Sequence, residues 1–232
     1  MTAAAVLKTL RERADAERAA RAARYFQAQE GGYGEGDVFL GISVPELRRL
    51  ARGLRDLPLE QTLELLRSSY HEARLLALLL LADRYRRAGP AEREEIFRSY
   101  LEHTAYVNNW DLVDQSAPRI VGPHLEEGDG SLLDRLAESS SLWERRIALL
   151  ATLHFIRRGR FADTLRLAEK LLDDPEEMVQ KAIGWMLREV GKRDEAALLG
   201  FLEEHAGRMP RATLRYATAK LPAALRRRFL GG

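Results

Sequence analysis

Helical periodicity is the feature of this sequence that most restricts its fold. Apolar residues recur at positions i, i+3, i+4 and i+7 almost throughout the 232 residues, whereas period-2 alternation of β-branched residues is not sustained anywhere. Breakers divide the chain into segments of about 10 to 18 residues, a length typical of helices in globular proteins. The sequence therefore predicts an all-α protein whose single domain covers residues 1–232.

The predicted helices begin with an unusually long one, from about residue 3 to residue 29, followed by a glycine-rich loop at 31–37. Ser43 and Glu46 form a predicted capping box, with Pro45 in the first turn of the next helix. Further helices are expected at 46–55, 59–68, 70–87, 90–103, 108–121, 131–139, 141–157, 161–172, 175–191, 194–206 and 210–220.

Short helices with brief connections favour an α-solenoid built from HEAT-like antiparallel helix pairs, and an ordinary helical bundle is the alternative. A weak internal repeat supports the solenoid. Segments that start at residues 70, 142 and 177 each lead into an Ala- and Leu-rich or Trp-containing helix. Their separations, roughly 35 to 72 residues, are near one or two HEAT periods.

Composition excludes several classes of function. The chain has no cysteine, which excludes disulfides, thiolate chemistry and cysteine-based zinc sites. Its five histidines lack metal-binding spacing, and no nucleotide-binding fingerprint is present, so neither a metal nor a cofactor is expected. No apolar run is long enough to span a membrane, and the first residues lack a signal-peptide pattern. We therefore expect a cytoplasmic protein.

The formal net charge of +2 conceals an asymmetry along the chain. Residues 140–232 contain 18 Lys and Arg against 12 Asp and Glu, which leaves the first 139 residues with a net charge of −4. A basic C-terminal part is compatible with an anionic partner.

Two of the three tryptophans lie near charged residues at helical spacing in the middle of the chain. Trp110 and Asp114 are i, i+4 neighbours, and Asn108 or Asn109 is a plausible N-cap for their helix. Asp111 is also compatible with a simple first-turn charge that complements the helix dipole. Around residues 142–146, Trp143 and Arg146 are three residues apart, although a tryptophan at helical spacing is more often part of the core.

The third tryptophan lies in a similar setting. Lys181, Trp185 and Arg188 occupy positions i, i+4 and i+7 of a predicted helix, so that an indole lies between two cations. The alternative is a solvated helix face with no partner. Three such sets on neighbouring helices would line one concave surface.

These segments resemble the AlkD-type DNA alkylation repair family. The similar stretches are Asn-Asn-Trp-Asp-Leu-Val-Asp at 108–114, Leu-Trp-Glu-Arg-Arg at 142–146 and Lys-Ala-Ile-Gly-Trp-Met-Leu-Arg-Glu at 181–189. Phe-Leu-Gly-Ile at 39–42, followed by Pro-Glu-Leu-Arg at 45–48, is similar to the family's N-terminal signature. The resemblance implies a HEAT-like solenoid with a concave basic cleft for duplex DNA.

The resemblance also implies roles for individual residues. The family's catalytic aspartate corresponds to Asp114, and its two cleft indoles correspond to Trp110 and Trp185. The family's basic cleft residue corresponds to Arg146, and Arg145, Lys181 and Arg188 fit as further DNA-binding residues. An ion pair of Arg188 with Glu189 or Asp114 is the alternative. The implied protein is a monofunctional glycosylase that acts as a monomer on 3-methyladenine and 7-methylguanine in duplex DNA.

The chemistry suits these residue types. An alkylated purine is already a cationic leaving group, so its release needs no general acid. Breaking the glycosidic bond builds positive charge on the deoxyribose, which a carboxylate such as Asp114 stabilises while it orients the attacking water. Each nearby indole face adds a cation–π interaction of about 0.5 to 2 kcal/mol.

The loop at 30–37 departs from the best-known active members, because it is longer and richer in glycine, and it resembles a less-characterised subgroup. Its acidic residues Glu30, Glu35 and Asp37 argue against a phosphate cradle and favour a flexible or tightly turned connector. Two alternative functions remain in view. One is a non-catalytic solenoid that binds damaged or branched DNA, and the other is a protein-binding HEAT-type scaffold.

Overall fold

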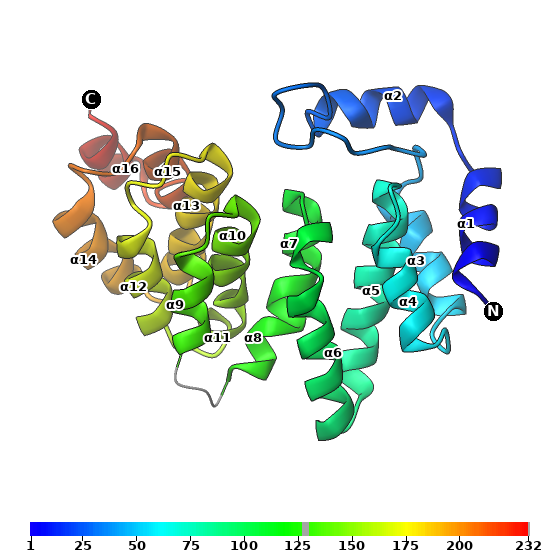
Figure 1. Cartoon of the computed structure of the whole chain (residues 1–232). Coiled ribbons are helices and arrows are strands. Elements are labelled where there is room, and N and C mark those ends of the chain that lie inside the picture. The colour runs from blue at the N-terminus through cyan, green and yellow to red at the C-terminus, as the bar shows by residue number, and fades with distance from the viewer. Residues whose placement is uncertain (127–129, 232) are drawn as a thin grey trace. The chain divides into compact units, whose positions relative to one another are not determined.

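The computed structural model describes residues 1–126 and 130–231, and all regular elements among them are helices (Figure 1). The prediction of an all-α fold is confirmed. The chain forms two compact units, Met1–Ile120 and Val121–Gly232, each with its own hydrophobic core. None of the described helices is long and apolar enough to cross a membrane.

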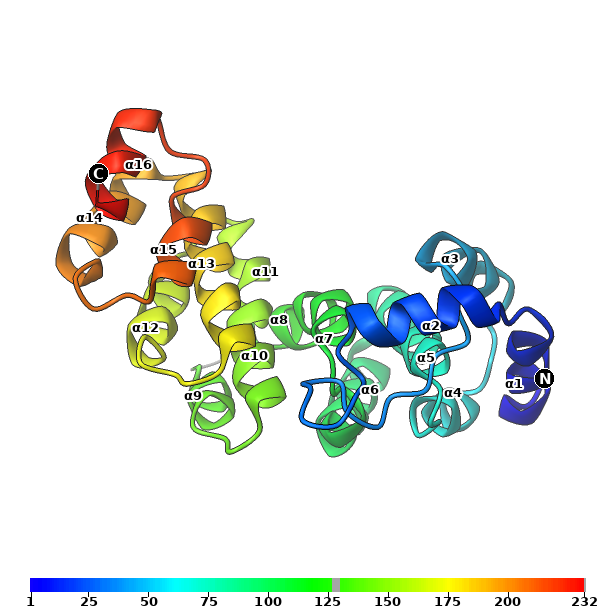
Figure 2. The same ribbon diagram turned by 90° about the horizontal axis from the view of Figure 1, so that it is seen from above.

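The first unit is built around α5, which buries most of its side chains and packs against α3, α4, α6 and α7. Helix α2 lies across the end of α5 (Figures 1 and 2) and buries none of its own residues. The helices of this unit are α1 (Ala3–Glu12), α2 (Ala16–Tyr25), α3 (Val44–Gly53), α4 (Leu59–Leu66), α5 (His71–Arg87), α6 (Pro90–Glu102) and α7 (Trp110–Ser116), with 3-10 turns at Thr104–Tyr106 and Ala117–Arg119.

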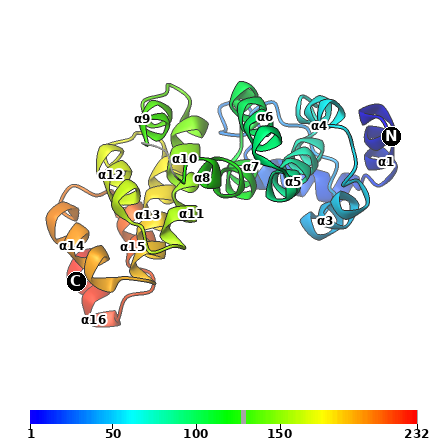
Figure 3. The same cartoon turned by 90° about the horizontal axis from the view of Figure 1, so that it is seen from below.

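The second unit is built around α13, which contacts α10, α11, α12, α14 and α15 (Figure 3). Gly184 permits the close approach of α15, because a Cβ atom there would lie 2.5 Å from both the Thr213 carbonyl oxygen and the Tyr216 Cβ. The helices of this unit are α8 (Val121–His124), α9 (Ser131–Ala137), α10 (Leu142–Ala151), α11 (Leu153–Ile156), α12 (Ala162–Lys170), α13 (Glu177–Gly191), α14 (Glu195–His205), α15 (Arg211–Ala217) and α16 (Ala223–Leu230).

The prediction of one long helix over residues 3–29 is wrong, because the chain turns between α1 and α2 at Asp15. The backbone N–H of Asp15 donates to the Leu40 carbonyl at 2.8 Å, and its carboxylate accepts from the backbone N–H of Arg18 at 2.9 Å. Asp15 is thus the N-cap of α2. A bond to a residue far along the chain diverts the backbone although helical periodicity continues on both sides.

The predicted caps have mixed outcomes. Ser43 precedes α3 with Pro45 in the first turn, as predicted, but its side chain makes no capping hydrogen bond, and Glu46 pairs with Arg13 at 3.4 Å instead. The capping box is therefore wrong. Asn109 is confirmed as the N-cap of α7, since its side-chain oxygen accepts from the Trp110 backbone N–H at 2.9 Å.

Two predicted helices are divided. The helix expected at 108–121 ends as α-helix at Ser116, just before Pro118, which has no backbone N–H to donate. The helix expected at 141–157 is interrupted at Thr152, whose hydroxyl donates to the Leu149 carbonyl at 2.7 Å. Helix α16 was not predicted, although it follows Pro222 directly.

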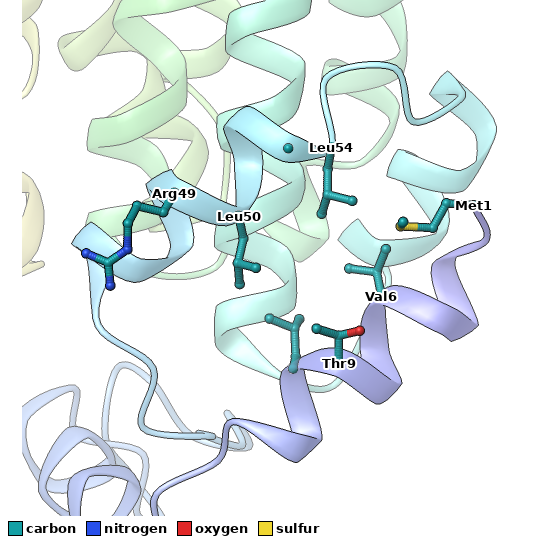
Figure 4. Close-up of a pocket in the computed structure, with 8 residues that line it drawn as sticks. Met1, Val6, Thr9, Arg49, Leu50 and Leu54 are labelled. Carbon is teal, nitrogen blue, oxygen red and sulfur yellow. The ribbon is translucent and has the colours of Figure 1, made fainter.

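Helix α1 packs by its apolar face, on which Val6 and Leu10 are buried. A hollow lies beside this face, bordered by Leu50 of α3 and by Leu54, which directly follows that helix (Figure 4). Apart from Thr9 and Arg49 its lining is apolar, so the hollow offers no set of groups for acid–base or metal chemistry.

Candidate functional site

Helix α7 carries two of the residues predicted to act on a substrate. Trp110 is its first residue and Asp114 lies one turn later, and both side chains are half-buried. Leu112 and Val113, by contrast, are fully buried. The helix therefore inserts one face into the core of the first unit while Trp110 and Asp114 retain contact with solvent.

An aromatic cluster holds the Trp110 indole in place. The Phe26 ring stacks on it with a centroid separation of 5.3 Å, and the Tyr25 ring meets it edge-on at 6.1 Å. Phe26 also lies 5.3 Å from the Phe39 ring and 5.0 Å from the His71 ring. The last residue of α2 and the residue that follows it therefore pack directly against the indole.

Beneath this cluster is a buried network of charged side chains. The His71 ring is 2% exposed, and its Nδ1 lies 2.9 Å from an Asp37 carboxylate oxygen. Its Nε2 lies 2.9 Å from an Asp111 carboxylate oxygen. Burial alone would lower the pKa of His71, but hydrogen bonds and charges from Asp111 and Asp37 outweigh it and raise the pKa to about 9. His71 is accordingly an imidazolium at neutral pH.

Asp37, at the end of the glycine-rich loop, connects this loop to α5 and to the start of α7. It accepts hydrogen bonds from the Arg74 guanidinium and from the side-chain amides of Asn108 at 3.2 Å and Asn109 at 3.4 Å. Burial would raise the pKa of Asp37, yet the His71 hydrogen bond and the Arg74 charge bring the pKa below its ordinary value. The carboxylate therefore stays ionised at neutral pH.

The glycine-rich loop is a tightly turned connector, as its acidity indicated. A Cβ atom at Gly34 would lie 2.2 Å from the Phe26 carbonyl oxygen, so only glycine allows the loop to fold against that segment. The loop places Asp37 in the interior, where the residue is 8% exposed. Its function in the structure is to position Asp37 beside α5 and α7.

The segment at 39–42 is anchored by a second buried carboxylate. Glu72 accepts hydrogen bonds from the backbone N–H groups of Leu40, Gly41 and Ile42 at 2.9, 2.7 and 3.3 Å. Gly41 has a φ of +79°, and a Cβ atom there would lie 2.4 Å from the Asp15 carbonyl oxygen. This segment, part of the similarity to the N-terminal signature, thus serves to bring α2 over the end of α5.

In the second unit, α13 carries the predicted stripe of cation, indole and cation. Lys181, Trp185 and Arg188 are all half-buried on one side of the helix. The Trp185 Nε1–H donates to a Glu189 carboxylate oxygen at 3.2 Å, and Arg188 lies 3.8 Å from the same oxygen. Lys181 pairs with Glu177 at 2.9 Å.

On α10, Trp143 and Arg146 are more deeply buried than the three residues of α13. Trp143 is 8% exposed, so its interpretation as a core residue is confirmed. Arg146 is 5% exposed and donates to the Met178 carbonyl, while Arg145 grips both carboxylate oxygens of Asp174 at 2.6 and 3.1 Å. Both arginines therefore have partners within the second unit.

The network of Asp37, His71 and Asp111 is the part of the site that sequence reasoning did not find. These residues are separated by 34 and 40 positions and share no periodic pattern. The available signal was local, because His71 and Glu72 are the first two residues of an apolar helix whose buried surface cannot leave polar groups unpaired. In residues 1–126 and 130–231 no group of three or more metal-ligating side chains is arranged to hold a metal ion.

Comparison with known proteins agrees with the fold and the motifs. The profile of the DNA alkylation repair enzyme family matches residues 6–221. Among solved structures, the fold is similar to that of a chain described as a predicted DNA alkylation repair enzyme from Enterococcus faecalis. The TM-score is 0.69 and the identity 20%, over 90% of this chain and 97% of that chain. No curated protein matches the sequence. The chain belongs to the DNA alkylation repair enzyme family, as the resemblance to its AlkD-type members implies.

Proposed function

We propose that this protein is a monofunctional DNA glycosylase that hydrolyses the N-glycosidic bond of cationic alkylpurines, such as 3-methyladenine and 7-methylguanine, in duplex DNA. One observation carries the proposal. In a chain of the alkylation repair family, the carboxylate of Asp114 lies one helical turn after the Trp110 indole, and both are half-buried on a helix with a fixed start.

In this proposal Asp114 stabilises positive charge that develops on the deoxyribose, and it orients the attacking water. The Trp110 indole stacks near the sugar and contributes about 0.5 to 2 kcal/mol of cation–π stabilisation. No general acid is required, because the alkylated base departs as a neutral molecule. The aromatic cluster and the buried network position α7 for this chemistry and do not contact the substrate.

The second unit contributes an indole and cations. Trp185 acts as the second aromatic surface, and Lys181 and Arg188 bind phosphate oxygens, which makes affinity dependent on salt. Arg145 and Arg146 remain predicted contacts for the DNA backbone, although in this structure Arg145 binds Asp174 and Arg146 binds the Met178 carbonyl. The proposal includes the HEAT-like repeat organisation and the basic cleft that the family resemblance implies.

The decisive experiment measures release of 7-methylguanine from methylated duplex DNA. We expect Asp114→Asn to reduce the single-turnover rate by about 100-fold or more, a loss typical for removal of one preorganised electrostatic group. Asp56→Asn is the matched control, because Asp56 is exposed and makes no ion pair within the described residues. Its rate should equal that of the wild type.

Three results would count against the proposal. Release by Asp114→Asn at the wild-type rate would remove the catalytic assignment. Duplex binding by the wild type without release above the spontaneous rate would favour the non-catalytic DNA-binding alternative. Binding that does not respond to salt, or no binding at all, would favour the protein-binding scaffold.

A further inference from the structure

The excess positive charge in the second half of the chain comes entirely from its last 22 residues. Residues 140–210 contain 12 Lys and Arg and 12 Asp and Glu, whereas residues 211–232 contain six Lys and Arg and no acidic residue. The basic C-terminal segment is defined here by these six side chains: Arg211, Arg215, Lys220, Arg226, Arg227 and Arg228.

All six side chains of the basic C-terminal segment are exposed. Arg211 and Arg215 lie one turn apart on α15, so they share a face, while Thr213 and Leu214 of that helix are buried toward the rest of the unit. Lys220 lies in the turn that follows, and the remaining three arginines are consecutive on α16. The segment therefore presents its charges to solvent.

Five of these six cations lack a carboxylate partner. Arg228 lies 3.1 Å from Glu203, but the others make no ion pair with any residue of 1–126 or 130–231. Elsewhere in the same unit, cations such as Lys170 and Arg208 pair with carboxylates at 2.6 and 2.7 Å. Unbalanced like charges repel one another and raise the local positive potential, which favours a polyanionic partner.

The chemistry of the segment selects a phosphate backbone over a membrane surface. Five of the six cations are arginines, whose planar guanidinium binds phosphate through two parallel hydrogen bonds. A membrane-binding basic helix needs a free apolar face. On α16 the apolar residues Leu225, Phe229 and Leu230 are half-buried, and the helix contacts α15.

The match to the family profile ends at residue 221, before α16 begins at Ala223. The three arginines of α16 therefore lie outside the residues that the family profile matches. We propose that the basic C-terminal segment is an additional, sequence-independent contact for the phosphate backbone of duplex DNA. This inference rests on the proposed DNA partner but not on excision activity.

The test is the salt dependence of binding to a lesion-free duplex, measured by fluorescence anisotropy with the full-length protein. Each phosphate contact contributes about −0.9 to the slope of log K against log salt concentration, so Arg226→Ser with Arg227→Ser should make the slope shallower by about 1.8. Arg135→Ser with Arg157→Ser is the matched control, since both residues are exposed in the same unit and lack ion pairs in the described part of the chain. Its slope should equal that of the wild type.

Each outcome decides the inference. An unchanged slope in the Arg226/Arg227 variant, or equal losses in both double variants, would overturn it.

Vesicles containing phosphatidylserine provide the alternative partner. Vesicle binding that the same substitutions abolish, with the DNA slope unchanged, would assign the segment to a membrane instead. Unaltered melting temperatures are expected because none of the four side chains is buried. If the protein releases the base but the salt slope of the Arg226/Arg227 variant is unchanged, only the glycosylase proposal is supported. If the slope changes but no base is released, only this inference is supported.

Discussion

His71 is a buried imidazolium held between two carboxylates, and its charge balances part of theirs. Asp37 and Asp111 each lie 2.9 Å from one ring nitrogen, and Arg74 supplies the other cation to Asp37. A neutral imidazole carries only one N–H, so without the imidazolium one of the two carboxylates would lose its donor from the ring, in an environment that solvates charge poorly. The charge of a single ring thus stabilises the junction between the glycine-rich loop, α5 and α7.

This charge predicts a dependence of stability on pH. The pKa of His71 is raised from 6.5 to about 9 in the folded chain, so the stabilisation is complete below pH 6.5 and is lost as pH rises through about 9. The loss is on the order of 3 kcal/mol across this window. Urea unfolding between pH 6 and pH 10 measures it.

His71→Gln should be less stable at pH 6 and should lack most of this pH dependence, because glutamine keeps a donor but no titrating charge. His103→Gln serves as the histidine control, because His103 contacts Ser99 and Tyr106 and lies outside the network. This variant should keep the decline in stability between pH 6 and pH 10. A wild-type free energy of unfolding that stays constant from pH 6 to pH 10 would contradict the imidazolium assignment.

A single residue, Asn109, determines where helix α7 begins. Asn109 caps the helix through the Trp110 N–H and also donates to Asp37, whereas its neighbour Asn108 donates to Asp37 without capping. Asn109→Ala should therefore cost about 1 kcal/mol more in the free energy of unfolding than Asn108→Ala. Thermal melting of the two variants gives the comparison, and equal losses would show that the cap contributes little.

The sequence predicted most helices because their apolar periodicity is a local property, and it located Asn109 as one of two candidate caps. It failed where a distant group decided the outcome. The chain changes direction at Asp15, whose backbone N–H donates a hydrogen bond to the Leu40 carbonyl. Glu46 forms an ion pair with Arg13 and does not take part in the predicted capping box. For the site, periodicity placed Trp110 and Asp114 on one helix side, but no local pattern linked residues 37, 71 and 111.

Across the whole molecule, the three tryptophans differ in solvent contact. Trp143 is 8% exposed, whereas Trp110 in the first unit and Trp185 in the second are half-buried. In variants that keep one tryptophan, with phenylalanine at the other two positions, acrylamide should quench Trp110 and Trp185 more strongly than Trp143. Duplex DNA should protect the first two only. Similar quenching of all three tryptophans, or no protection by DNA, would contradict the proposal that Trp110 and Trp185 contact DNA.

Gly184 stands directly before Trp185, and its missing side chain sets the distance between α13 and α15. Any larger residue there would force α15 outward, and Arg211 and Arg215 would move with it. The separation between the helix that carries Trp185 and the helix that carries these two arginines therefore depends on the absence of a side chain at Gly184. Gly184→Ala would add only one methyl group and replace no polar side chain. It would nevertheless change the distance between α13 and α15, and with it the positions of the arginines on α15.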